Sequence, residues 1–177
     1  MTRAADRDFP RVVASAAKGD EVAFARLVAT FNGEMHRVCV VVARDRAIAE
    51  EAVQAAWLIA WRKLGKVREP DRVRPWLVSV AVNEVKKLLK QRQRRLGREL
   101  PLDQAEEAGG VDPVTGIAAF DLRVALERLD PDDRALLAMR YVAGFNASEL
   151  SVALGLSPSG TRTRLERLLA RLRQELE

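Results

Sequence analysis

Apolar residues recur three and four positions apart along most of this sequence, and that spacing limits the fold more than any other feature. One such stripe comprises Phe24, Leu27, Val28, Phe31, Met35, Val38 and Val42. Residues at this spacing share one face of an α-helix, which must pack against other elements to leave water. Aromatic residues make up only 5% of the chain, and this also favours helices over sheets. We therefore predict an all-α protein.

Prolines and capping residues divide the chain into the predicted helices. Asp20 can cap the second helix, and the prolines of segment 65–75 predict an exposed basic loop. The Asp130-Pro131 pair marks another helix start, and Asn146 with Glu149 resembles a capping box. Five predicted helices have both ends marked, at about residues 10–18, 45–64, 117–129, 131–142 and 161–176. Three more have a marked start only: they begin after Asp20, near residue 76 and after Asn146.

Residues 97–116 interrupt the helical pattern, because they combine Pro and Gly with a run of acids. The acids are Glu99, Asp103, Glu106, Glu107 and Asp112. This composition is typical of a tether rather than of a packed element. We predict two small helical domains, residues 11–95 and 117–177, joined by a flexible acidic linker at 96–116.

The charge is unevenly distributed, although the net charge is only +5. Residues 86–98 carry basic side chains and no acid: Lys86, Lys87, Lys90, Arg92, Arg94, Arg95 and Arg98. Such a run can bind nucleic-acid phosphates with release of counterions, but it can also be a solvated helix face. Trp76 and the basic loop that precedes it favour a platform for single-stranded DNA.

The segment from Asn146 to Arg173 has the pattern of a helix-turn-helix. This segment contains a short helix, a turn at Gly155 and a second helix, the order found in helix-turn-helix proteins that bind the major groove of DNA. Four side chains of the second helix fall away from its leucine stripe: Arg162, Thr163, Arg164 and Arg167. Arginine suits bidentate contacts with guanine or phosphate. The alternative is a basic, solvated helix in a helical hairpin.

Few groups in the sequence suit catalysis or metal binding. Cys39 is the only cysteine and His36 the only histidine, so we expect no disulfide, no metal site and no cofactor. Phosphate-binding loops and a nucleophile with a base are missing, and we expect neither an enzyme nor a small-molecule substrate. Without a long apolar segment we expect no membrane insertion and a cytoplasmic location. Trp57 and Trp61 are expected in the core.

The N-terminal half resembles the extracytoplasmic-function (ECF) group of the sigma-70 sigma factors. The residues that carry this resemblance are Gly19-Asp20 with Ala23–Leu27, then Asp45, Ala49, Glu50, Glu51, Gln54 and Trp57, and finally Trp76-Leu77 with Ala81-Val82-Asn83 before the basic run. The C-terminal half is similar to the same family at Leu126, Leu129-Asp130-Pro131, Leu154–Ser157, Arg162–Leu165, Arg167 and Leu172-Arg173. The likeness covers about residues 11–95 and 117–176, in the family's order.

The resemblance implies a sigma factor that binds core RNA polymerase and directs initiation at promoters with −10 and −35 elements. It places polymerase binding at Glu50, Glu51 and Gln54. It implies −10 recognition and melting by residues 11–95, through Arg68, Arg72, Arg74, Trp76, Asn83, Lys86, Lys87 and Lys90. It implies −35 recognition by a helix-turn-helix within 117–177, through Arg162, Thr163, Arg164 and Arg167. An anti-sigma factor is left open as a further partner.

Two alternatives remain: a helix-turn-helix regulator that acts without polymerase, and a helical protein-interaction module. The sequence also departs from the family pattern near the −35 helix. Gly160 is an additional glycine there and costs about 1 kcal/mol relative to Ala inside a helix. Glu166 is an acid on the expected reading face, where it could accept a hydrogen bond from cytosine or repel phosphate.

Overall fold

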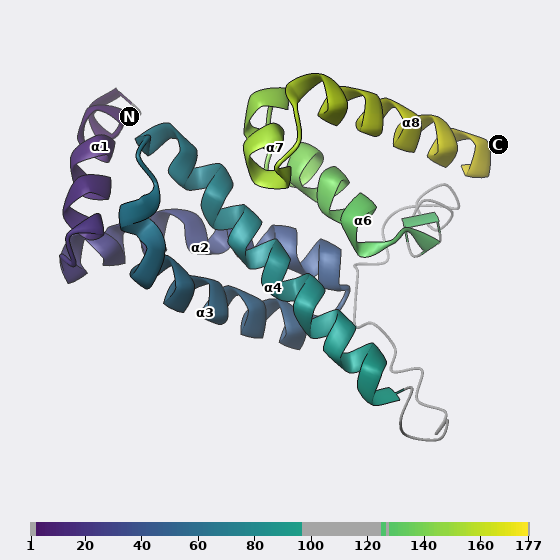
Figure 1. The fold of residues 1–177 in the computed structure, drawn as a ribbon, viewed down its shortest axis with the longest axis horizontal. Helices are drawn as coiled ribbons and strands as arrows, with labels where there is room; N and C mark the ends of the chain where they lie inside the picture. Colours follow the sequence, from purple (N-terminus) through teal and green to yellow (C-terminus); the bar gives the residue numbers. More distant parts are fainter. Residues whose placement is uncertain (1–2, 97–124, 127, 177) are drawn as a thin grey trace.

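Helices make up all the regular structure that the computed structural model describes, which covers residues 3–96, 125–126 and 128–176. This confirms the predicted all-α fold (Figure 1). The helices are α1 (Arg3–Ala17), α2 (Glu21–Ala43), α3 (Arg46–Lys63), α4 (Val73–Leu96), α6 (Pro131–Leu137), α7 (Ala147–Leu154) and α8 (Pro158–Leu176). Two 3-10 turns, η1 (Leu64–Lys66) and η2 (Pro70–Arg72), precede α4, and a π-helical turn, η3 (Ala138–Val142), extends α6.

The helices α1 to α4 form an N-terminal bundle in which α2, α3 and α4 pack against one another and α1 packs on α2. Asp20 and Asp45 cap α2 and α3, since their carboxylates accept the backbone N–H groups of Ala23 and Ile48. Most of the predicted stripe of α2 is buried, whereas Phe24 and Val28 are partly exposed. The buried face of α3 is mostly alanine, which lets its neighbours approach closely.

The predicted helix ends are wrong in three places. Helix α1 begins at Arg3 rather than near residue 10 and contains Pro10. Helix α4 begins at Val73 rather than at 76, because Pro75 lies in the first turn, where a missing N–H costs no hydrogen bond. Helix α8 begins at Pro158 rather than at 161, since proline is favoured at the first helical position.

The helices α6, α7 and α8 form a second group, which we call the C-terminal helices. Asp130 caps α6 as predicted, and Asn146 with Glu149 forms the predicted capping box of α7. Gly155 then ends α7 with a φ of 66°, a left-handed conformation that glycine adopts without a steric penalty. The turn between α7 and α8 is therefore the tight connection that a helix-turn-helix requires.

The C-terminal helices pack against the N-terminal bundle, an arrangement that the sequence did not predict. Helix α7 lies against α4, while α6 and η3 lie against α2 (Figure 1). The buried residues of both groups form one hydrophobic cluster, with Phe145 and Leu136 fully enclosed. The predicted linker at 96–116, apart from Leu96 at the end of α4, lies outside the described residues, as does most of the predicted helix at 117–129.

Candidate nucleic-acid interface

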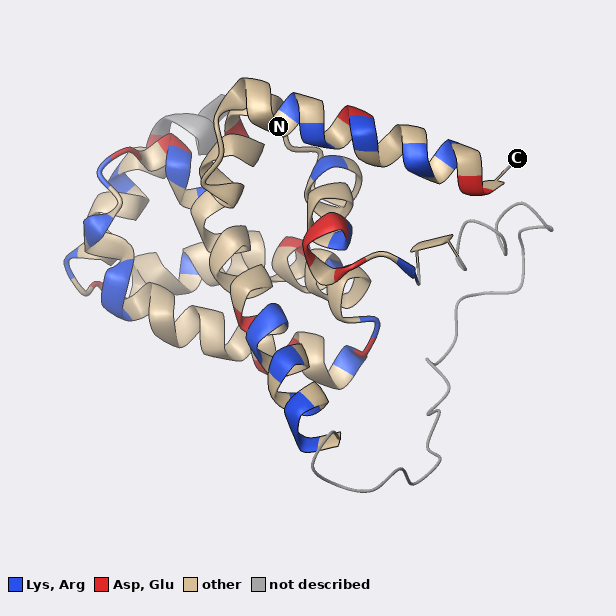
Figure 2. Ribbon diagram, turned by 45° about the vertical axis from the view of Figure 1, so that its right-hand side comes forward, with Lys and Arg blue, Asp and Glu red and all other residues tan. Residues whose placement is uncertain are grey.

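Basic residues gather along two helices, at the C-terminal end of α4 and along α8 (Figure 2). Each of these helices contains residues that the sequence analysis assigned to DNA. We call the exposed side of α8 and the turn before it the α8 surface. We call the exposed basic and amide side chains of η2, α4 and the segment between η1 and η2 the α4 surface.

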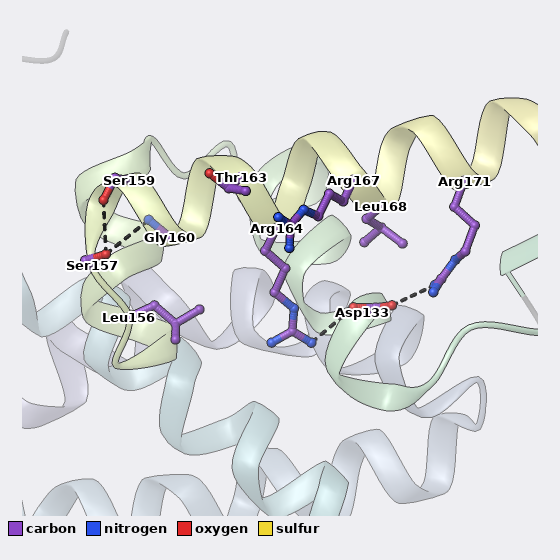
Figure 3. A pocket seen from close by; sticks show the side chains of 10 residues that line it. All are labelled: Asp133, Leu156, Ser157, Ser159, Gly160, Thr163, Arg164, Arg167, Leu168 and Arg171. Carbon is purple, nitrogen blue, oxygen red and sulfur yellow. Dashed lines mark hydrogen bonds and ion pairs between the residues drawn. The ribbon is translucent and has the colours of Figure 1, made fainter.

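An open cavity of about 820 Å³ lies between α8, the turn before it, and Asp133 of α6. Three of the four residues that the sequence analysis assigned to the −35 element, Thr163, Arg164 and Arg167, line it together (Figure 3). Arg162 is exposed but does not line this cavity, and neither does Glu166. Arg171 also lines the cavity, although it was not predicted from the sequence to bind DNA.

Asp133 binds two arginines at the base of this cavity (Figure 3). Its carboxylate accepts hydrogen bonds from Nη2 of Arg164 at 3.0 Å and from Nη2 of Arg171 at 2.7 Å. Asp133 is only 8% exposed, and its backbone N–H donates to the capping carboxylate of Asp130. The sequence does not predict this role of Asp133, since a contact with α8 leaves no mark in local sequence. Such charge-assisted pairs hold Arg164 in one direction.

The N-terminal turn of α8 explains the unusual glycine. The Ser157 hydroxyl accepts the backbone N–H of Gly160 at 3.0 Å and so caps the helix. A Cβ atom at residue 160 would lie 3.0 Å from this hydroxyl oxygen. Gly160 therefore leaves room for the cap, and its position in the first turn lowers the cost expected of a glycine inside a helix.

The α4 surface exposes five of the residues predicted to bind the −10 element. They are Arg68, Arg72, Asn83, Lys87 and Lys90. Arg72 pairs with Glu69 at 2.8 Å and Lys87 with Glu84 at 3.0 Å. Because Arg72 and Lys87 are exposed, these pairs are weak and phosphates can displace them. Trp76 is half-buried and packs against the core.

Arg74 and Lys86, also predicted to bind the −10 element, contact the C-terminal helices instead of lying on the open surface. Arg74 pairs with Glu34 of α2 and with Glu149 of α7, the latter at 2.7 Å. Its hydrogen bond with Glu34 is the main reason why the pKa of Arg74 is raised above its usual value. Lys86 pairs with Asp132 of α6 at 2.8 Å, and this bond lowers the pKa of Asp132.

The residues predicted to bind polymerase lie together on the exposed side of α3. Glu50, Glu51 and Gln54 are exposed on successive turns, followed by Leu58, which is 64% exposed. Trp61 is 42% exposed, so its expected core position is wrong. Its ring packs edge-on against Phe24, which keeps it at the rim of the bundle.

Groups suited to metal binding are not brought together within the described residues. No three side chains among His, Cys, Asp and Glu lie close enough there to hold a metal ion. Cys39 is buried, and burial raises the pKa of its thiol to about 12. None of the helices described is both long and apolar enough to span a membrane.

Two family models match the chain: Sigma-70 region 2 over residues 27–95 and Sigma-70 region 4 over residues 119–172. The chain is similar to the RNA polymerase sigma factor CnrH of Cupriavidus metallidurans, with 31% identity over 93% of this chain and 93% of that protein. It is also similar to the probable RNA polymerase sigma factor RfaY of Xanthomonas campestris pv. campestris, with 30% identity over 91% of this chain. That relative is longer, and the match spans 42% of it.

The fold is similar to that of the sigma factor RpoE from Bartonella quintana, solved in complex with the anti-sigma factor NepR. The TM-score is 0.65 with 19% identity, and the match covers 86% of this chain and 96% of that one. The two family regions fall on the two groups of helices, one on the N-terminal bundle and the other on the C-terminal helices.

Proposed function

Because the chain belongs to the ECF group of the sigma-70 family, it binds core RNA polymerase and directs promoter-specific initiation, and we propose which residues do so. Residues 11–95 engage polymerase and the melted −10 element, and residues 117–177 bind the −35 element. The nucleotide chemistry belongs to the polymerase, so this chain performs no catalytic step of its own. Its place of action is the cytoplasm, where the chromosome lies.

One observation carries the −35 assignment: Thr163, Arg164 and Arg167 line one cavity at the start of a helix that follows a tight turn. The first turns of such a helix are the part that enters the major groove. Asp133 supports this role because it directs Arg164, and a fixed guanidinium group can donate two hydrogen bonds to guanine.

The −10 assignment is supported by the α4 surface and by the basic end of α4. The exposed cations supply phosphate contacts, whose strength falls as salt rises. Arg68 lies between η1 and η2, and this protruding loop can accommodate an unstacked base. Arg74 and Lys86 can also bind DNA phosphates when DNA replaces the carboxylates that now pair with them.

The polymerase contact is assigned to Glu50, Glu51 and Gln54 on α3. Exposed carboxylates beside exposed apolar side chains suit a partner with a mixed basic and apolar surface. An anti-sigma factor is a further partner that we propose, supported by the similar fold of RpoE with NepR.

Charge reversal tests the polymerase contact. Glu51→Lys should weaken binding to core polymerase, because it places like charge against a basic partner surface, while the thermal stability stays unchanged at this exposed site. Glu21→Lys, which changes another exposed acid of the bundle, is the control. Unchanged affinity of Glu51→Lys for core polymerase in a titration would remove α3 from the interface.

Promoter-specific initiation itself is tested by transcription of a genomic promoter pool with purified core polymerase. Adding this protein should produce transcripts that start at defined sites. Retention of the protein on duplex DNA without polymerase, together with no defined start sites, would favour a regulator that acts alone.

A further inference from the structure

Glu166 is an acid among the basic residues of α8, and the proposed function gives it no role. Its side chain is exposed. Within the described residues no hydrogen bond or ion pair holds its carboxylate, although Arg162 lies four positions earlier, a spacing that allows such a pair on a helix. Both carboxylate oxygens of Glu166 are therefore available to a partner outside the chain.

The outward face of α8 lies opposite the residues that the core buries. Thr161, Leu168 and Leu172 are buried, and they lie one or two turns apart on one side of the helix. Exposed residues at spacings of three and four occupy the opposite side: Thr163, Glu166, Arg167 and Ala170. Glu166 therefore shares the outward face with two of the residues proposed to bind the −35 element.

Arginines lie along both edges of this outward face. Arg164 and Arg171 lie on the edge that faces α6, where both bind Asp133 (Figure 3). Arg162 and Arg173 are exposed along the other edge. An α-helix with its side chains is about 10–12 Å wide, and the major groove is about 12 Å wide. A helix that enters the groove therefore brings its edges near the phosphates and its outward face near the bases.

We propose that Glu166 determines specificity at one position of the −35 element, where its carboxylate accepts a hydrogen bond from the exocyclic amino group of a cytosine. This inference rests on the proposed binding of α8 to that element. Cytosine fits because its major-groove edge offers an amino donor and no acceptor. Adenine has the acceptor N7 beside its amino group, and guanine and thymine present acceptors that repel a carboxylate.

The neighbours of Glu166 allow its carboxylate to reach the bases. Thr163 precedes it by three positions and Ala170 follows it by four, so both lie beside it on the outward face. Both side chains are shorter than that of glutamate, and the carboxylate extends beyond them. The arginines at the edges of α8 neutralise nearby phosphates, and this offsets the cost of bringing an acid to DNA.

A promoter library tests this assignment with the full chain and core polymerase. A promoter that the wild-type protein uses is randomised over its −35 element, and a barcode in each transcript identifies its template. Glu166→Ala removes the carboxylate, and Glu166→Gln replaces it with an amide. Alanine and glutamine both favour helices, so α8 should stay folded. The control is Glu175→Gln, which neutralises an exposed acid in the last turn of α8.

The wild-type protein and the control should prefer cytosine at one position of the −35 element. In Glu166→Ala this preference should fall by about fivefold or more, as expected for the loss of one base contact. In Glu166→Gln the preferred base at the same position should become adenine, because glutamine can contact N6 and N7 of adenine together.

Three results of this selection would overturn the proposal. The wild-type protein could show no cytosine preference at any position, or both Glu166 variants could keep every base preference of the wild type. A uniform gain of Glu166→Ala over all −35 sequences would show instead that Glu166 only repels phosphate. If no protein, including the wild type, starts transcription at defined sites on any template, the proposed function fails and this inference fails with it.

Discussion

At the scale of single residues, Asp133 combines burial, a fixed backbone and two cationic partners. It lies in the first turn of α6, where the helix dipole also favours a negative charge. Arg164 and Arg171 reach it from α8, so the carboxylate joins the two helices that flank the cavity. A carboxylate near DNA would repel phosphate if it were exposed, but here the two arginines cover it.

Replacing Asp133 with Asn should destabilise the protein. Hydrogen bonds to charged groups contribute about 1.5–3 kcal/mol, and we expect about 1–2 kcal/mol because both arginines are partly exposed. The measurement is the free energy of unfolding in urea. Glu175→Gln, which neutralises an exposed acid of α8, is the control. Equal losses for the two variants would contradict the supporting role of Asp133.

Arg164→Lys tests whether the guanidinium group reads a base. Lysine keeps the positive charge but loses the planar pair of donors that guanine recognition uses. Initiation at promoters selected by the wild-type protein should fall by a factor that corresponds to about 1–3 kcal/mol. Arg162→Lys, outside the cavity, should have a smaller effect. A uniform loss on promoters with and without the −35 element would assign Arg164 to phosphate binding instead.

At the scale of helices, the N-terminal turn of α8 depends on two residues together: Ser157, which caps the helix, and Gly160, which leaves room for the Ser157 hydroxyl. Ser157→Ala should cost about 1 kcal/mol, because the cap is lost. Gly160→Ala alone should be nearly neutral, since its gain in helix propensity is offset by crowding of the Ser157 hydroxyl. In the Ser157→Ala background the same change should stabilise the protein. Additive unfolding energies in this double-mutant cycle would show that Gly160 and the cap are independent.

Helices with strong local signals could be predicted from the sequence, and contacts between helices could not. The caps at Asp20, Asp130 and Asn146 depend on residues within one turn, so they were predicted correctly. The leucine stripe of α8 is also a local signal, and it places Thr163, Arg164 and Arg167 outside the apolar face. Glu149 lies 75 residues from its partner Arg74, and Asp132 lies 46 residues from Lys86; helical periodicity carries no information about such pairs.

At the scale of the whole molecule, the two groups of helices are in contact in a protein whose proposed targets are far apart. This contact covers Arg74 and Lys86 but leaves the α8 cavity and the exposed face of α3 accessible.

The central claim is that this chain, together with core polymerase, opens DNA at a −10 element. Permanganate footprinting of a promoter selected by the two proteins tests it most directly, because permanganate oxidises unpaired thymines. Thymines of the −10 element should become reactive only when polymerase and this protein are both present. Duplex binding by this protein with all thymines unreactive in the presence of polymerase would contradict the claim.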